Sequence, residues 1–515
     1  MKTVSDDLFR LIKTLNKSEK GYFKKFAAKN AGGSRQNYLV LFDAIDSMEE
    51  YDEDLLRKKL KKETFLKQIA VYKVYLFNLI LKALHQYGAQ DKAEEKLTDL
   101  MINIKILISR ALFKEAGKLI KKAKELAYKY DKLKFIHELL GAERNLLFAF
   151  PDKNIYTKRK QIFKDQTDYI LKLNEFFEFS WLVDRMTILV DHQADFKHSQ
   201  KTDEMEKILK HPLLTTEAAA NTYTTSLYQT HTKLLYYTAK RENEKIYEYL
   251  KKEITLAEKN PHFIDENPQN YAFGLINFLL CSSYSHKRND IRETIMKLGS
   301  LRRRLKNKIS QHEEINIFFY ADNIEMLIYE QNCDLKRGRL KARAIEKNLK
   351  KFKDKVPAQR RIILLTDLAY FYLLDGDLDQ ALHFINIVLN EASSDFRSDA
   401  YEFAKIFQLV VHFELGNFDL LEYLVSSTEK FFKEKKKLLK SEAAVIEFFK
   451  KVIKVREDEL DDLFSELKYK LKKEEKNIHE QSFLVFFDFI SWADSKLSGR
   501  QFVEVLKQKN KQNRA

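Results

Sequence analysis

The sequence contains little glycine and little proline, and this scarcity limits the folds that it can form. Only 12 glycines and 5 prolines occur among 515 residues, although glycine alone averages about 7% of ordinary proteins. Sheets and hairpins need such turn residues at short intervals. Because 44% of the residues are hydrophobic and 33% are charged, the composition indicates a globular, all-α protein with a large core.

Cysteine is equally rare. The two that occur, Cys281 and Cys333, exclude a disulfide framework and a four-thiolate zinc site, and each stands among apolar residues as a small packed side chain would. The first twenty residues carry acids and no long apolar run, unlike a signal peptide. No stretch approaches the roughly 20 apolar residues of a membrane helix. We therefore expect a cytoplasmic protein without membrane insertion.

Motifs of catalysis and cofactor binding are missing as well. The sequence has no Gly-x-x-x-x-Gly-Lys-Ser/Thr, no Gly-x-Gly-x-x-Gly and no Gly-x-Ser-x-Gly. One local cluster, His192 and His198 with Asp191 and Asp195, lacks the His-Glu-x-x-His spacing of a metal site and is more typical of polar surface. We expect no catalytic residue, no cofactor and no metal, although fold class alone never excludes an enzyme.

Three aspartates alternate in the segment LLDGDLDQALHFINIVL (373–389), which raises the question of a calcium loop. Such a loop needs glycine at its sixth position and a bidentate glutamate at its twelfth. Counted from Asp375, those positions hold Gln380 and Asn386. A turn between two helices explains the segment better, with Gly376 in a left-handed conformation and Asp377 as the cap of the second helix.

The same segment resembles a tetratricopeptide repeat, in which two short helices form a hairpin around a small turn residue. Its residues match the family pattern at the following positions: Leu368 and Ala369 for the Leu-Gly pair, Tyr372 for the tyrosine, Gly376 for the turn and Ala381 for the alanine. Leu365 replaces the family's tryptophan, and no closing proline follows. Residues 108–127 and 407–427 repeat the pattern more loosely.

This resemblance implies an α-solenoid of stacked antiparallel helix hairpins. We predict an N-terminal helical cap over residues 1–90, degenerate hairpin repeats over 91–356, and tetratricopeptide-like repeats with capping helices over 357–515. Thr366 and Tyr370 would then face the partner groove. The phrases LIKTLNKSEKGYFKKFA and LGNFDLLEYLVSSTEKFFK also make the chain similar to a group of large conserved bacterial proteins, a likeness that supplies no function.

Positive charge is concentrated in one part of the chain, whose formal net charge is +16. Residues 301–361 hold seventeen Lys/Arg and eight Asp/Glu. In the segment 335–353 the residues Gly338, Ala342, Ile345, Leu349 and Phe352 have helical spacing and should pack inward. The basic residues left for a polyanion are Arg302, Arg303, Arg304, Arg337, Lys341, Lys347, Lys350 and Lys351.

The sequence therefore favours a non-enzymatic scaffold that binds an unknown protein or peptide on a concave helical surface. Nucleic acid or another polyanion, bound by the 301–361 region, is the alternative partner. A solvated basic face without any partner also explains that region.

Overall fold

The structure is a computed structural model, and it describes residues 6–30, 35–88, 92–149, 154–191, 198–216, 220–284, 287–306, 309, 311–352, 355–392, 398–434, 438–475, 477, 480–484 and 486–512. Within these ranges the chain forms α-helices and short 3-10 turns and contains no strand. The predicted all-α class is confirmed. The chain divides into two compact units, Met1–Glu314 and Ile315–Ala515. The boundaries predicted at residues 90 and 356 stay predictions.

The first unit begins with helices that share one core. These are α1 (Asp7–Thr14), α2 (Lys17–Asn30), α3 (Arg35–Asp46), α4 (Glu53–Lys59), the 3-10 turn η2 (Thr64–Gln68) and α5 (Ile69–Gly88). Phe23 and Phe42 meet at its centre, with ring centroids 4.7 Å apart, and Leu76 and Ile80 of α5 are fully buried there.

One segment in the described part of the chain, Thr64–Tyr87, is long and apolar enough to cross a membrane by length and composition. The expectation that no stretch approaches this size was therefore wrong. In the structure α5 packs one face on α1, α2 and α3, while Val71, Val74 and Tyr75 on another face are exposed. A cytoplasmic location stays a prediction.

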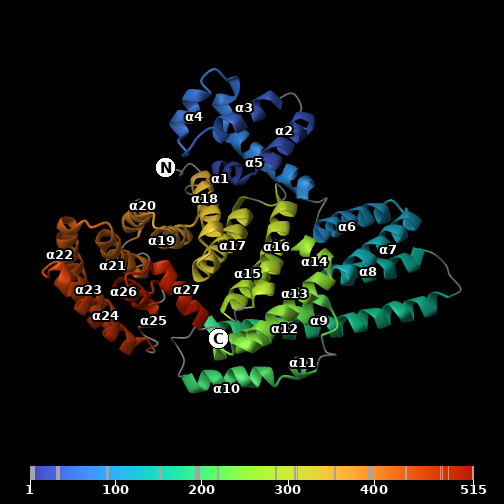
Figure 1. Cartoon of the computed structure of the whole chain (residues 1–515). Coiled ribbons are helices and arrows are strands. Elements are labelled where there is room, and N and C mark those ends of the chain that lie inside the picture. Colours follow the sequence, from blue (N-terminus) through green and yellow to red (C-terminus); the bar gives the residue numbers. More distant parts are fainter. Residues whose placement is uncertain are drawn as a thin grey trace. The chain divides into compact units, whose positions relative to one another are not determined.

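The remaining helices of the first unit pack largely on their neighbours in sequence. They are α6 (Ala93–Ser109), α7 (Phe113–Lys129), α8 (Leu133–Ala149), α9 (Ile155–Asp191), α10 (His198–Leu209), α11 (Pro212–Thr215), α12 (Tyr223–Lys240), α13 (Asn243–Lys259), α14 (Pro261–Glu266), α15 (Pro268–Tyr284) and α16 (Arg288–Leu305). Helices α6, α7, α8 and α9 lie side by side in that order, and α12 packs on α9 and α13 (Figure 1).

The second unit is built around one continuous core. Its helices are α17 (Gln311–Gln331), which begins just before the unit boundary, α18 (Leu335–Phe352), α19 (Ala358–Asp375), α20 (Leu378–Glu391), α21 (Ser398–Glu414), α22 (Phe418–Glu434), α23 (Lys440–Val452), α24 (Leu460–Glu474), α25 (Gln481–Leu484), α26 (Phe489–Leu497) and α27 (Phe502–Gln512), with the 3-10 turn η5 (Glu457–Glu459). Trp492 is buried among Phe413, Phe448, Phe449 and Phe464, with ring centroids 5.3–6.1 Å away. Such aromatic contacts add to the burial of apolar area.

The segment 375–377 is a helix turn, as its sequence predicts. Gly376 ends α19 with φ +82°, in the left-handed region that favours glycine. The Asp377 carboxylate then caps α20 by accepting a hydrogen bond from the Gln380 amide at 3.2 Å. Gly416, within the more loosely matching segment 407–427, has the same left-handed conformation, with φ +71°.

Candidate functional site

The predicted basic patch is divided between the two units. Arg302, Arg303 and Arg304 lie on α16 of the first unit, where Arg304 approaches Asp265 at 3.5 Å. The other five residues lie on α18 of the second unit, and all of the inward positions predicted for this helix are buried. The exposed basic residues among these five are Arg337, Lys347, Lys350 and Lys351.

Lys341 differs from the other basic residues of α18 because its ammonium group lies between two carboxylates. Its side chain is only 16% exposed, its Nζ is 2.9 Å from Asp322, and it also pairs with Glu325. Burial acts to lower the pKa of Lys341, but the two carboxylates outweigh burial and raise it. This ammonium therefore holds α18 on α17.

The two residues predicted for the partner groove lie in different surroundings. Thr366 is buried, and its hydroxyl donates to the Ile362 carbonyl of the same helix at 2.9 Å. Tyr370, one turn later, lines a cavity of the second unit. Their role in partner binding stays a prediction. His192 and Asp195 of the predicted His/Asp cluster lie outside the described residues, as do the side chains of Asp191 and His198.

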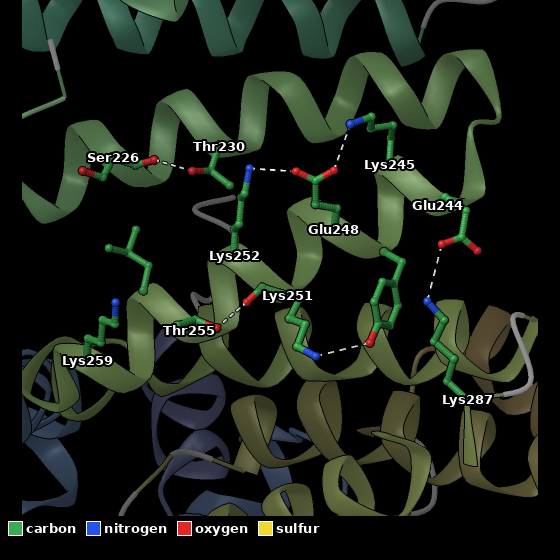
Figure 2. Close-up of a pocket in the computed structure, with 12 residues that line it drawn as sticks. Ser226, Thr230, Glu244, Lys245, Glu248, Lys251, Lys252, Thr255, Lys259 and Lys287 are labelled. Atoms are coloured by element: carbon green, nitrogen blue, oxygen red, sulfur yellow. Dashed lines mark hydrogen bonds and ion pairs between the residues drawn. The ribbon is translucent and has the colours of Figure 1, made fainter. Parts of the chain in front are cut away.

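A shallow, open groove of about 940 Å³ runs along α13 in the first unit. Five lysines and two glutamates line it, namely Lys245, Lys251, Lys252, Lys259, Lys287, Glu244 and Glu248, together with Ser226, Thr230, Tyr247, Thr255 and Leu256. Figure 2 shows these side chains, which come from α12, α13 and, for Lys287, the residue just before α16. The lining carries a surplus of positive charge, and we call it the lysine groove.

Part of the charge in the lysine groove is balanced internally. Glu248 pairs with Lys245 and with Lys252, each at 2.9 Å, and these hydrogen bonds lower the pKa of Glu248 (Figure 2). Glu244 pairs with Lys287 at 3.5 Å. Lys251 and Lys259 have no ion-pair partner among the described residues, and both are exposed. These two lysines are the groove's available cations.

Charge counting along the sequence misses the lysine groove. Residues 240–259 hold six Lys/Arg and five Asp/Glu, so the segment is almost neutral. The fold separates the two signs, because Glu253 bonds His231 at 2.9 Å and Glu258 bonds Tyr271 at 2.8 Å, away from the groove lining. The signal that could have found it is the spacing of Lys245, Lys252 and Lys259, every seventh residue on one helix face.

A second exposed surface runs along α9, which has 37 residues and is therefore about 55 Å long. Large hydrophobic side chains on one face are 49–77% exposed: Tyr156, Phe163, Ile170, Leu171, Phe177, Trp181 and Ile188. We call this face the α9 stripe. The opposite face is buried on α8, α10 and α12 through residues such as Phe179 and Met186.

The α9 stripe has a regular spacing. Tyr156, Phe163, Ile170 and Phe177 follow one another at seven-residue intervals, so a straight helix brings them to one side. Patches of this kind on soluble proteins commonly mark interaction sites. The spacing is present in the sequence. However, the sequence cannot distinguish a helix with one exposed apolar face from a helix whose apolar faces are both buried.

A comparison of the sequence with protein-family models finds no match, and a comparison with curated proteins finds none either.

Proposed function

We propose that the protein is a non-enzymatic scaffold that binds a helical segment of another protein along the α9 stripe. The observation that carries the proposal is the exposure of large apolar side chains at heptad spacing, for example Phe163 (70%) and Phe177 (60%). Water contact with such surface costs about 25 cal/mol per Å², so covering it favours association. An amphipathic helix with the same spacing is the partner geometry that suits it.

The charges beside the α9 stripe indicate the orientation in which a partner helix would bind. Lys158, Lys160 and Lys164 accompany its first half, whereas Glu175 and Glu178 accompany its second half. A partner helix of opposite polarity, acidic where α9 is basic, would pair favourably along the whole length. A second copy of α9 in antiparallel orientation has that polarity.

We also propose that the helices form an α-solenoid of stacked antiparallel hairpins. Consecutive helices pack on one another from α18 through α24, with additional contacts between α19 and α21 and between α21 and α23. Neighbour-on-neighbour packing is what stacked hairpins require. The repeat-like match around Gly376 supports this architecture for α19 and α20.

The test compares a double variant of the stripe, Phe163→Glu with Phe177→Glu, with a matched control in the second unit. Tyr423→Glu with Tyr469→Glu places two charges on aromatic positions that are 70% and 61% exposed. We expect a partner protein to co-purify with the wild type and the control from native lysate, and to be lost from the stripe variant. Identical co-purified proteins and identical sedimentation for all three chains would refute the proposal.

Sedimentation velocity of the purified chains separates two kinds of partner. If the wild type and the control sediment as a dimer and the stripe variant as a monomer, the partner is a second copy. If all three sediment as monomers, the co-purified protein is the partner, and its binding to the three purified chains is then measured directly.

The second candidate function is binding of a polyanion in the lysine groove. The observation that favours it is a pair of exposed lysines, Lys251 and Lys259, that have no ion-pair partner among the described residues. A polyanion would displace counterions, so its affinity should fall steeply with added salt. The glutamates Glu244 and Glu248 in the same lining weaken the match to a uniformly charged backbone.

This second function is tested with a fluorescent generic DNA oligonucleotide at low salt. Lys251→Glu with Lys259→Glu should reduce binding at least tenfold, whereas Lys114→Glu with Lys118→Glu on the exposed face of α7 makes the same charge change elsewhere and should have a much smaller effect. Equal losses in the two variants would mean non-specific attraction to a basic protein. No binding by the wild type would exclude the function.

A further inference from the structure

A cavity of about 300 Å³ lies within the second unit, enclosed by α17, α19, α27 and the segment that leads into α26. Glu330 of α17 lines it and is only 5% exposed. One of its carboxylate oxygens, Oε1, is buried and has no hydrogen-bond partner among the described residues. Buried polar atoms are nearly always bonded, so an unpartnered one in a cavity wall calls for an explanation.

Four of the fourteen residues that line the cavity are aromatic. Phe486, Phe487 and Phe489 line the cavity together with Tyr370, whose ring meets that of Phe487 edge to face at 5.7 Å. Aromatic faces carry negative potential and attract organic cations more strongly when water is excluded. The wall therefore offers both apolar contact area and favourable electrostatics to a positive group.

The other charged groups of the lining do not satisfy Glu330. Lys509 of α27 donates to Asp488 at 2.7 Å, and Asp488 also accepts bonds from the Ser491 amide and hydroxyl. Glu475 is exposed. The one basic group of the described lining is thus already paired with a carboxylate, and the site keeps a negative balance.

The electrostatic environment makes Glu330 sensitive to what occupies the cavity. Burial, and then the nearby Asp367 carboxylate of α19, raise the pKa of Glu330 well above its ordinary value. Burial raises the pKa of the Tyr370 phenol as well, followed by the charges of Glu330 and Asp488. A cation placed beside Glu330 would lower its pKa and release its proton.

We propose that this cavity binds an organic cation, an alkylammonium or guanidinium group, with Glu330 as its counter-ion and the aromatic wall as its cage. A volume of about 300 Å³ equals roughly ten waters, which suits a small amine or the end of a lysine or arginine side chain. A metal ion fits less well, because no group of three metal-binding side chains occurs among the described residues.

The test uses isothermal titration calorimetry on the full chain with n-butylammonium as the probe and 1-butanol as its neutral counterpart. We expect n-butylammonium to bind and 1-butanol not to bind. The variant Glu330→Gln keeps the size of the side chain and removes its charge, and it should weaken n-butylammonium binding about 30-fold or more. The control Glu504→Gln removes an exposed charge from α27 and should bind like the wild type.

Thermal unfolding of the same variants guards against a folding artefact. Because Glu330 is buried without a full set of partners, Glu330→Gln should have a melting temperature equal to or above that of the wild type. A folded Glu330→Gln chain that binds n-butylammonium as tightly as the wild type would overturn the proposal. The proposal would also be overturned if the wild type bound neither n-butylammonium nor the blocked lysine described next.

The source of the cation is distinguished with a blocked lysine, Nα-acetyl-lysine N-methylamide, as a second probe. If this probe binds in a Glu330-dependent way, the natural ligand includes a lysine side chain of a protein. If only n-butylammonium binds so, the ligand is a free small amine. Both outcomes support the cation site, which is independent of the α9 stripe and of the lysine groove.

Discussion

The two units use charge in opposite ways. In the lysine groove of the first unit, five lysines share an open surface with two glutamates, and water solvates most of them. In the second unit, Glu330 lines a cavity together with four aromatic residues and lacks a full set of hydrogen bonds. Exposed charges interact weakly and tolerate change, whereas a buried charge has large effects on its surroundings. Location, rather than the number of charges, decides what each site can recognise.

The same contrast holds for packing. Buried residues of the first unit form separate clusters, one around Phe23, one around Leu97 and one around Phe179. Most of those in the second unit belong to one large cluster that extends from Ile315 to Ala493, beside a small one around Cys333 and Val503. A continuous core should unfold as one cooperative element, whereas separate clusters allow local opening.

The largest expected effect tests that cooperativity. Phe449 is fully buried beside Trp492 in the second unit, so Phe449→Ala should destabilise this unit by about 3–5 kcal/mol through lost contacts and a cavity. Only two tryptophans occur, Trp181 and Trp492. Urea unfolding followed by Trp492 fluorescence in a Trp181→Phe background therefore reports the second unit, and a change below 1 kcal/mol would contradict a tightly packed core.

The next effect concerns pH. Burial raises the pKa of Asp367 to about 7, although Asn323 donates a hydrogen bond to its carboxylate. Between the unfolded value of about 4 and this folded value, the folded state binds the extra proton, so stability falls as pH rises. Between pH 4.5 and pH 7.5 the wild type should lose up to about 3 kcal/mol of unfolding free energy through Asp367, and Asp367→Asn should not show this loss.

The measurement is the difference in urea midpoint between the wild type and Asp367→Asn at these two pH values, again by Trp492 fluorescence. The two chains must be compared because carboxyl groups with a lowered pKa, such as Glu429 and Glu466, make both chains more stable as pH rises. Parallel pH profiles for the two chains would show that Asp367 is not the group responsible.

A smaller effect compares two helical glycines. A Cβ atom on Gly338 of α18 would lie 2.2 Å from Cε2 of Phe371, which is fully buried in α19, so Gly338→Ala should destabilise by about 1–3 kcal/mol through overpacking. Gly141 of α8 has open space around the same position, and Gly141→Ala should stabilise by up to about 1 kcal/mol. Chemical denaturation followed by circular dichroism measures both, and equal effects would remove the packing argument.

The smallest effect belongs to the lysine groove. Glu248→Gln breaks ion pairs with Lys245 and Lys252, but both lysines are exposed, so stability should change by less than about 0.5 kcal/mol. The same change frees two cations and should tighten binding of an acidic peptide about twofold or more at low salt. A loss of stability above 1 kcal/mol would mean that the groove is a structural ion network.

Much of the fold could be predicted from local patterns. The scarcity of glycine and proline indicated helices throughout, and the spacing of Ala342, Ile345 and Leu349 correctly predicted the buried face of α18. The turn at Gly376 and the cap at Asp377 also followed from residue type. Each of these features depends on contacts within a few residues, which a sequence displays directly.

The candidate sites were harder to predict. Lys341 looked like a free cation, yet Asp322 and Glu325 on another helix enclose its ammonium group. The lysine groove lies in a nearly neutral segment, and Thr366 of α19 is buried. For Lys341 the deciding contacts come from a neighbouring helix, and for the lysine groove they are made by Glu253 and Glu258, which lie outside the groove lining.

The sequence by itself determined that the chain is helical, which face of a basic helix turns inward, and where a repeat-like turn lies, because helical periodicity and capping are short-range properties. Only the tertiary structure decided which charges remain available and which apolar face of α9 stays exposed. Burial and pairing depend on segments brought together from distant parts of the chain. Glu330 shows this most clearly, since three aromatic residues that line its cavity, Phe486, Phe487 and Phe489, follow more than 150 residues later.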